Sequence, residues 1–165
     1  MRGFLALAAI AITIGVIVPK LYVVDPSAKA SLAAVETPEV INNTRSVTIT
    51  RGGNGHFQTE ASVDGRRINF LVDTGASVIA LRESDAARLG IHPAARDYSA
   101  RVSTANGQVN AARTELNRVE VGGVTVRNVA ALVLPDEALG QNLLGMSFLS
   151  RLHWEQKNGK LILEQ

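Results

Sequence analysis

The sequence predicts an all-β domain built from short strands, on three observations. Short apolar or alternating runs recur from residue 45 to residue 165, and turn signals separate them. Only one segment of this region, residues 83–90, has the character of a convincing helix. Aromatic residues make up only 4% of the 165 residues, so the core must consist mainly of aliphatic side chains. Regularly spaced short strands are typical of a β-sandwich or a β-barrel.

The first part of this region is predicted to form three strands. SVTITR (46–51) and HFQTEASV (56–63) alternate in polarity, and a glycine-rich turn separates them. Asp64-Gly65 is a hairpin signal, after which RRINFLV (66–72) forms the third strand and leads into Asp73. One face of the second strand is expected to carry Phe57, Thr59, Ala61 and Val63.

A further strand and the helix follow. SVIALR (77–82) is apolar enough to be a strand, and ESDAARLG (83–90) is predicted to be a short helix. Ser84 is the predicted N-cap, and Gly90 is the predicted stop.

The last part of the chain returns to strands. Two long strands are predicted on either side of Asn106-Gly107, where a type I′ turn is expected, and Gly122-Gly123 turns into another apolar strand. NLLGMSFLSRL (142–152) is interpreted as the end of an apolar strand and a short helix. HWEQKNGKLILEQ is interpreted as a final hairpin around Asn158-Gly159.

The N-terminal segment has a different character. Residues 1–24 contain an apolar run that, with its extension beyond Pro19 and Lys20, reaches the length of about 20 residues needed to cross a bilayer. Arg2 favours a cytoplasmic N-terminus. We therefore predict a single-pass transmembrane signal anchor in the inner (cytoplasmic) membrane.

The rest of the chain is expected to lie in the periplasm or another extracytoplasmic space. Residues 25–44 read as a flexible linker, and residues 45–165 as the folded domain. The alternative to an anchor is a signal peptide cleaved near Ala30. Both interpretations export the domain.

Composition argues against several classes of function. The absence of cysteine excludes thiol nucleophiles and Cys-ligated metals. A net charge of +2 without basic clusters argues against nucleic-acid binding. His56, His92 and His153 lack ligand spacing, so we predict no metal and no cofactor.

The triplet Asp73-Thr74-Gly75 is the strongest chemical signal. Asp is depleted in strands, and an unpaired buried carboxylate is costly. Gly75 suggests a sharp loop in which backbones approach closely. A carboxylate at the end of a rigid apolar strand is well positioned for chemistry, although a bare triplet also fits an ordinary turn. The motifs around the triplet are therefore needed to distinguish a catalytic carboxylate from an ordinary turn.

Three ordered motifs resemble those of aspartic proteases, most closely the retroviral type. FLVDTGAS (70–77) has the catalytic-loop form, and NLLGMSFL (142–149), about 70 residues later, matches the strand and helix that brace this loop. STANGQV (103–109) takes the place of the flap hairpin, and the helix after the first motif also fits. The resemblance covers about 120 residues and implies a retropepsin-like closed barrel of the single-motif, membrane-anchored bacterial type.

The resemblance also implies roles for individual residues. Asp73 would be the catalytic carboxylate, and Thr74 would hydrogen-bond across a dimer axis. The catalytic loop would be completed by Gly75, Ala76 and Ser77. The flap, which would contact substrate, would contain Thr104, Ala105, Asn106, Gly107 and Gln108. Structural support would come from Leu143, Leu144 and Gly145. No base pattern surrounds Ser77, which argues against a serine hydrolase.

A single motif has a consequence for assembly. This chemistry needs two carboxylates that share a proton: one acts as base on a water molecule and the other as acid on the scissile carbonyl. One chain of this length forms one lobe, so the resemblance implies a homodimer with one Asp73 from each subunit. A different partner chain with its own motif is the alternative.

The sequence therefore predicts an aspartic endopeptidase. Its expected role is limited processing of extracytoplasmic or membrane-proximal proteins. The alternative function is a noncatalytic, membrane-tethered β-domain that binds peptides or protein partners through the same groove.

Overall fold

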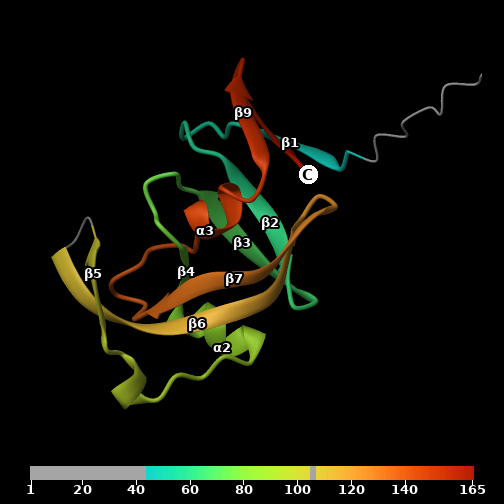
Figure 1. Ribbon diagram of the computed structural model, residues 1–165. Helices are drawn as coiled ribbons and strands as arrows, with labels where there is room; N and C mark the ends of the chain where they lie inside the picture. Colours follow the sequence, from blue (N-terminus) through green and yellow to red (C-terminus); the bar gives the residue numbers. More distant parts are fainter. Residues whose placement is uncertain (1–43, 105–106) are drawn as a thin grey trace, which may run out of the picture. The chain divides into compact units, whose positions relative to one another are not determined.

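The computed structural model describes residues 44–104 and 107–165, which all fall within one unit of the chain, Asn42–Gln165 (Figure 1). Strands dominate these residues, and the helices are short. The strands are β1 (Ser46–Thr50), β2 (Gln58–Val63), β3 (Arg66–Val72), β4 (Ile79–Arg82), β5 (Ala100–Thr104), β6 (Gly107–Val121), β7 (Val124–Leu134), β8 (Leu143–Leu144), β9 (His153–Lys157) and β10 (Lys160–Glu164). The helices are α2 (Glu83–Leu89), the 3₁₀ helix η2 (Ala95–Asp97) and α3 (Met146–Leu149).

Seven strands form the main sheet, in the order β2-β3-β8-β4-β7-β6-β5. An additional pairing between β2 and β6, in which Val63 lies opposite Val119, joins the sheet back on itself. The pairs β3–β8 and β4–β7 are parallel, whereas the hairpin pairs are antiparallel. The predicted all-β, barrel-like architecture with few helices is confirmed.

A smaller sheet contains β1, β10 and β9 in that order. β10 lies in the middle, and its two neighbours are both antiparallel to it. The predicted C-terminal hairpin is confirmed: Asn158 and Gly159 connect β9 to β10 with φ angles of 52° and 71°. Two consecutive positive φ angles are the mark of a type I′ turn, which Asn-Gly favours.

The core is mainly aliphatic, as the composition predicts, with Phe70 and Phe148 as its largest fully buried side chains. Phe57, directly before β2, and Ala61 and Val63 within it are buried, and Thr59 is half-buried, so the predicted face is confirmed. Burial of each large aliphatic side chain contributes about 1.5–3 kcal/mol. This core holds the strand ends that carry the candidate site.

Helix α2 ends as predicted but begins differently. Gly90 takes the left-handed conformation, with φ 85°, and terminates the helix. The prediction of Ser84 as N-cap is wrong, because the helix begins at Glu83 and Arg82 holds the N-cap position without a side-chain cap. The Ser84 backbone N–H instead donates a hydrogen bond of 3.0 Å to Oδ1 of Asp136, from the loop after β7.

This contact predicts an acid-sensitive contribution to stability. The hydrogen bond from Ser84, together with nearby Arg82, lowers the pKa of Asp136 below its ordinary 3.8. Because this pKa is lower in the folded chain than in the unfolded chain, the stabilisation is present above about pH 4 and is lost as the pH falls further. Asp136→Asn should lower the melting temperature at neutral pH and weaken its decline on acidification. Thermal unfolding between neutral and strongly acidic pH, with Glu137→Gln as control, tests this expectation. Equal acid sensitivity of Asp136→Asn and the unaltered chain would contradict it.

The β5–β6 hairpin forms where the flap is predicted, but its register differs. Thr104 lies opposite Gly107, so Gly107 is the first residue of β6 and not part of the predicted two-residue turn. The Thr104 hydroxyl donates to the Gly107 carbonyl oxygen over 2.9 Å. Ala105 and Asn106 lie outside the described residues.

The predicted anchor (1–24) and nearly all of the predicted linker (25–44) also lie outside the described residues. Among the helices of residues 44–104 and 107–165, none is long and apolar enough to span a bilayer.

Candidate active site at the Asp73 loop

Asp73 directly follows β3, a strand of the main sheet. The β2–β3 hairpin sets the register of this strand through Asp64 and Gly65, whose φ angles are 49° and 88°. The short strand β8 runs parallel to the end of β3. The Asp73 backbone N–H donates to the Leu144 carbonyl oxygen over 3.1 Å, so the sheet itself fixes this residue.

The loop after Asp73 folds back onto its carboxylate. The Gly75 N–H donates a hydrogen bond of 2.8 Å to Oδ1 of Asp73, and the Ala76 N–H approaches the Asp73 carbonyl oxygen at 3.3 Å. A Cβ atom on residue 75 would lie 3.2 Å from the same Oδ1. Glycine therefore leaves room for the close approach to the carboxylate that the triplet predicts, whereas a Cβ atom would make a tight contact.

Gly145 holds the other side of this loop. A Cβ atom at this position would lie 2.2 Å from the Val78 carbonyl oxygen and 2.7 Å from that of Ala76. The next residue, Met146, donates its backbone N–H to the Ala76 carbonyl oxygen over 2.8 Å. Helix α3 and the loop after Asp73 are therefore in backbone contact, which only glycine permits.

Ser147 is a further support that the sequence motifs do not single out. Its hydroxyl donates to the Ala130 carbonyl oxygen over 2.8 Å and accepts the Ile79 backbone N–H over 3.0 Å. One side chain on α3 thus joins β4 to β7 directly behind the loop. A serine within an apolar helix is the signal that could have suggested this role.

Asn142 is a second support, and it is buried with 4% exposure. Its Oδ1 accepts the Arg82 backbone N–H over 2.8 Å. Its Nδ2 donates to Oδ2 of Asp85 over 2.8 Å and to the Asn69 carbonyl oxygen over 3.1 Å. This amide ties β3, β4 and α2 to the start of β8, so its hydrogen-bonding capacity serves to place the strand that holds Asp73.

A groove of about 770 Å³ opens at the carboxylate. From the predicted sites, its lining contains Asp73, Gly75, Ala76, Ser77, Thr104 and Leu143. Thr74, Gly107 and Gln108 are described but do not line it, and Leu144 and Gly145 are buried beneath it. Val102 and Ser103, which precede the predicted flap residues on β5, line the groove together with Asp73.

The walls of the groove are largely apolar and come from four parts of the chain. Val102 belongs to β5, Ala80 to β4 and Leu143 to β8. Further apolar lining comes from β7 and the loop after it: Leu132, Leu134, Ala138 and Leu139. Asp73 is the one acidic residue that the described part of the chain contributes to this lining.

Two further polar side chains belong to this loop. Thr74 and Ser77 are exposed, and within the described residues neither hydroxyl has a hydrogen-bond partner. In the same part of the chain, no group of three or more His, Cys, Asp or Glu residues could hold a metal ion. From the part of the chain that the structure describes, the groove therefore presents one oriented carboxylate and no second acid.

Comparison with known proteins agrees with this geometry. Residues 59–151 match the family described as "gag-polyprotein putative aspartyl protease". The solved structure of a retropepsin-like aspartic protease from Rickettsia conorii is similar, with a TM-score of 0.65 and 39% sequence identity. The similarity covers 73% of this chain and 91% of that one.

Two curated relatives match a similar region. An uncharacterized protein from the cobV 5′ region of a Sinorhizobium species is 50% identical over 103 residues, which are 62% of this chain and 44% of the relative. An uncharacterized protein of Rickettsia prowazekii is 42% identical over 108 residues, which are 64% of this chain and 45% of the relative. The chain thus matches less than half the length of each. On these matches, the chain belongs to the retropepsin-like aspartic proteases.

Proposed function

We propose that this chain is an aspartic endopeptidase whose active site forms when two copies associate. The observation that carries this proposal is the single carboxylate of Asp73, which is fixed by backbone contacts at the floor of an apolar groove. One carboxylate cannot be both base and acid in the same step. A second Asp73 from another copy would complete the pair.

The chemistry then follows from two adjacent carboxyl groups. Like charges in contact cannot both ionise, so the pair shares one proton. The ionised Asp73 takes a proton from a water molecule, whose oxygen attacks the scissile carbonyl carbon. The protonated Asp73 of the other copy donates its proton to the carbonyl oxygen. When the tetrahedral intermediate collapses, the C–N bond breaks, the first Asp73 gives the proton it took from water to the leaving amine, and a hydroxyl of the intermediate returns a proton to the second Asp73.

The exposed side of the loop after Asp73 supports an interface with a second copy of the chain. Thr74 is exposed, and its hydroxyl finds no partner within the described residues of one chain. A two-fold axis beside Asp73 would bring two Thr74 residues together, because an isologous interface pairs the same surface on both copies. We infer that Thr74 hydrogen-bonds across this axis. A different chain with its own Asp-Thr-Gly loop is the alternative partner.

The groove indicates what kind of peptide fits. Val102, Leu132, Leu134 and Leu139 give it an apolar lining beside Asp73. Burial of an apolar substrate side chain there provides binding energy without unpaired polar groups. We propose that the preferred peptides carry apolar residues next to the scissile bond. The apolar character of residues 1–24 supports limited processing of membrane-proximal, extracytoplasmic proteins as the biological role.

A dilution experiment with the full chain tests the proposal. The chain, purified in a nonionic detergent, would be incubated with a diverse peptide pool, and products would be identified by mass spectrometry. Where copies dissociate, doubling the enzyme concentration should raise the cleavage rate about fourfold, because dimers form by mass action.

Light scattering on the same samples gives the mass of the active species. A cleavage rate proportional to enzyme concentration, from a species with the mass of a monomer, would contradict the shared active site. Absence of cleavage from a confirmed dimer would favour the alternative function, a noncatalytic domain that binds peptides in the groove.

A further inference from the structure

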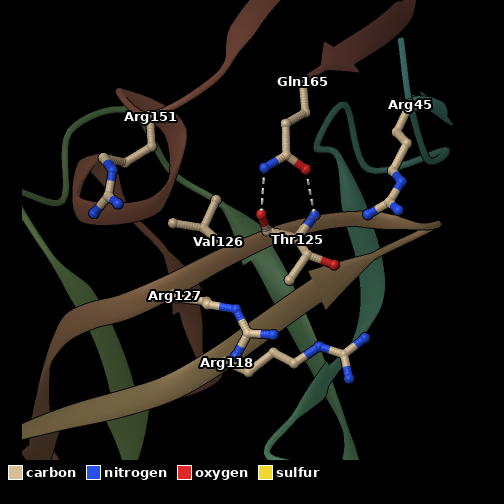
Figure 2. Close-up of a pocket in the computed structure, with 7 residues that line it drawn as sticks. All are labelled: Arg45, Arg118, Thr125, Val126, Arg127, Arg151 and Gln165. Carbon is tan, nitrogen blue, oxygen red and sulfur yellow. Dashed lines mark hydrogen bonds between the residues drawn. The ribbon is translucent and has the colours of Figure 1, made fainter. Parts of the chain in front are cut away.

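A second cleft, lined by arginines, lies at the hairpin end of β6 and β7 (Figure 2). It shares no lining residue with the Asp73 groove. Its volume of about 370 Å³ is in the range of roughly 300–1,000 Å³ that is typical of small-ligand pockets. Four of its seven lining residues are Arg45, Arg118, Arg127 and Arg151. We propose that this cleft binds a phosphate-class oxyanion, a role that does not rest on the proteolytic function.

Within the described residues, most of this positive charge has no counter-ion. Arg118 forms an ion pair with Glu120. Within residues 44–104 and 107–165, no carboxylate lies within 4.0 Å of the guanidinium groups of Arg45, Arg127 or Arg151. Asp64 is the other acid in contact with this part of β6, and it accepts backbone N–H groups of Asn117 and Arg118 instead. The cleft is therefore complementary to an anion.

Two of the arginines are placed against each other by the sheet. Arg118 on β6 lies directly opposite Arg127 on β7. Both side chains are exposed, because the alternation of buried and exposed positions is interrupted at Asn117–Arg118 and again at Arg127–Asn128. Directly opposed residues have Cβ atoms about 4.5–5.5 Å apart, and like charges in this position destabilise a ladder. A bound anion between them would relieve this repulsion.

The floor of the cleft is held in place before any ligand arrives. The Gln165 side chain donates to the Thr125 carbonyl oxygen over 2.7 Å and accepts the Thr125 N–H over 3.0 Å, as Figure 2 shows. The Gln165 backbone N–H donates to the Arg45 carbonyl oxygen over 3.0 Å. Val126, which is 4% exposed, anchors the same segment of β7 in the core. The backbones that carry Arg45, Arg118 and Arg127 are thus fixed to one another.

The donor type indicates the ligand chemistry. Guanidinium groups are planar forks that bind phosphate oxygens through paired, charge-assisted hydrogen bonds. Several forks around a small cleft match a phosphate monoester or diphosphate, which presents several oxygens at once. The phosphate could belong to a soluble molecule or to a phospholipid headgroup, and the experiment must separate these two sources.

Calorimetric titration of the full chain with inorganic phosphate and with pyrophosphate, at low salt, is the first measurement. We expect saturable binding, tighter for pyrophosphate. The double substitution R118Q/R127Q should weaken binding at least tenfold. The matched control R67Q/R96Q removes the same charge from exposed arginines outside the cleft and should bind as the unaltered chain does.

Vesicles identify the source of the phosphate. Sedimentation with phosphatidylcholine vesicles, with and without phosphatidic acid, would be compared for the unaltered chain and R118Q/R127Q. If phosphatidic acid increases the fraction of the unaltered chain that sediments with vesicles, and R118Q/R127Q shows no such increase, the ligand is a lipid phosphate. If calorimetry detects binding but phosphatidic acid does not increase sedimentation, the ligand is a soluble phosphate. If R118Q/R127Q does not fold, the titration is repeated with R151Q, which leaves the strand pair intact and should also weaken phosphate binding. Undetectable binding of both phosphate probes, or equal binding by R118Q/R127Q and the control, would overturn the proposal.

Discussion

Asp73→Asn should reduce peptide cleavage by about 10²–10⁴-fold or more, the range expected when a general acid–base group is lost. An amide cannot take a proton from water, and two amides cannot share the proton that the pair requires. The substitution keeps the size of the side chain and the oxygen that accepts the Gly75 N–H, so the loop should keep its geometry. The melting temperature should therefore change little.

Cleavage of the preferred peptide by the full chain, followed by mass spectrometry, measures this loss. Asp97→Asn is a matched control, because it removes another partly exposed carboxylate that does not line the groove. The control should retain full activity. Cleavage by Asp73→Asn at the rate of the unaltered chain would disprove the mechanism.

Mixing the two forms extends the test to the dimer. An excess of Asp73→Asn chains should suppress the activity of a fixed amount of unaltered chain, since most unaltered chains would then sit in mixed pairs with one carboxylate. An equal excess of Asp97→Asn should not suppress it. Unchanged activity in the presence of excess Asp73→Asn would argue against a site shared between copies that exchange.

The parts of the fold that the sequence predicts correctly are those set by local interactions. Asp64-Gly65 and Asn158-Gly159 dictate tight turns because these residues accept positive φ angles, and both hairpins form where expected. Gly90 ends α2 for the same reason. The prediction of Ser84 as N-cap was wrong because the start of α2 depends on a distant residue. The carboxylate of Asp136, far from Ser84 in sequence, meets the helix only in the folded chain.

In the candidate site, too, the sequence predicts what is local and does not predict contacts between distant residues. The Asp-Thr-Gly triplet and the Leu-Leu-Gly segment were found because each is a contiguous motif, and the structure joins them through the hydrogen bond from Asp73 to Leu144. Asn142 and Ser147 support the same loop, yet their partners lie 17–73 residues away. A serine within an apolar helix is a local signal for Ser147, but no local pattern identifies the partners of either residue, and only the fold reveals them.

Gly145→Ala should be the most damaging single-methyl substitution near the site. The added Cβ would meet the Val78 carbonyl oxygen at 2.2 Å, and both groups belong to backbones that cannot rotate away. Overpacking of this kind costs about 3 kcal/mol at its upper range, because the contact can be relieved only by separating packed elements. Here the separation would move α3 away from Ala76 and release the hydrogen bond from Met146. We therefore expect cleavage to be lost together with stability.

Gly140→Ala provides the matched control for this loss. Gly140 lines the Asp73 groove, but a Cβ atom there would have no heavy atom within 4 Å. Thermal unfolding should show a decrease in melting temperature of roughly 10 °C or more for Gly145→Ala and little change for Gly140→Ala. The two variants add the same methyl group, so the difference between them measures how closely α3 must approach the loop that carries Asp73. A melting temperature of Gly145→Ala equal to that of the control would show that the loop can shift at little cost, and the view of Asp73 as rigidly held would then be wrong.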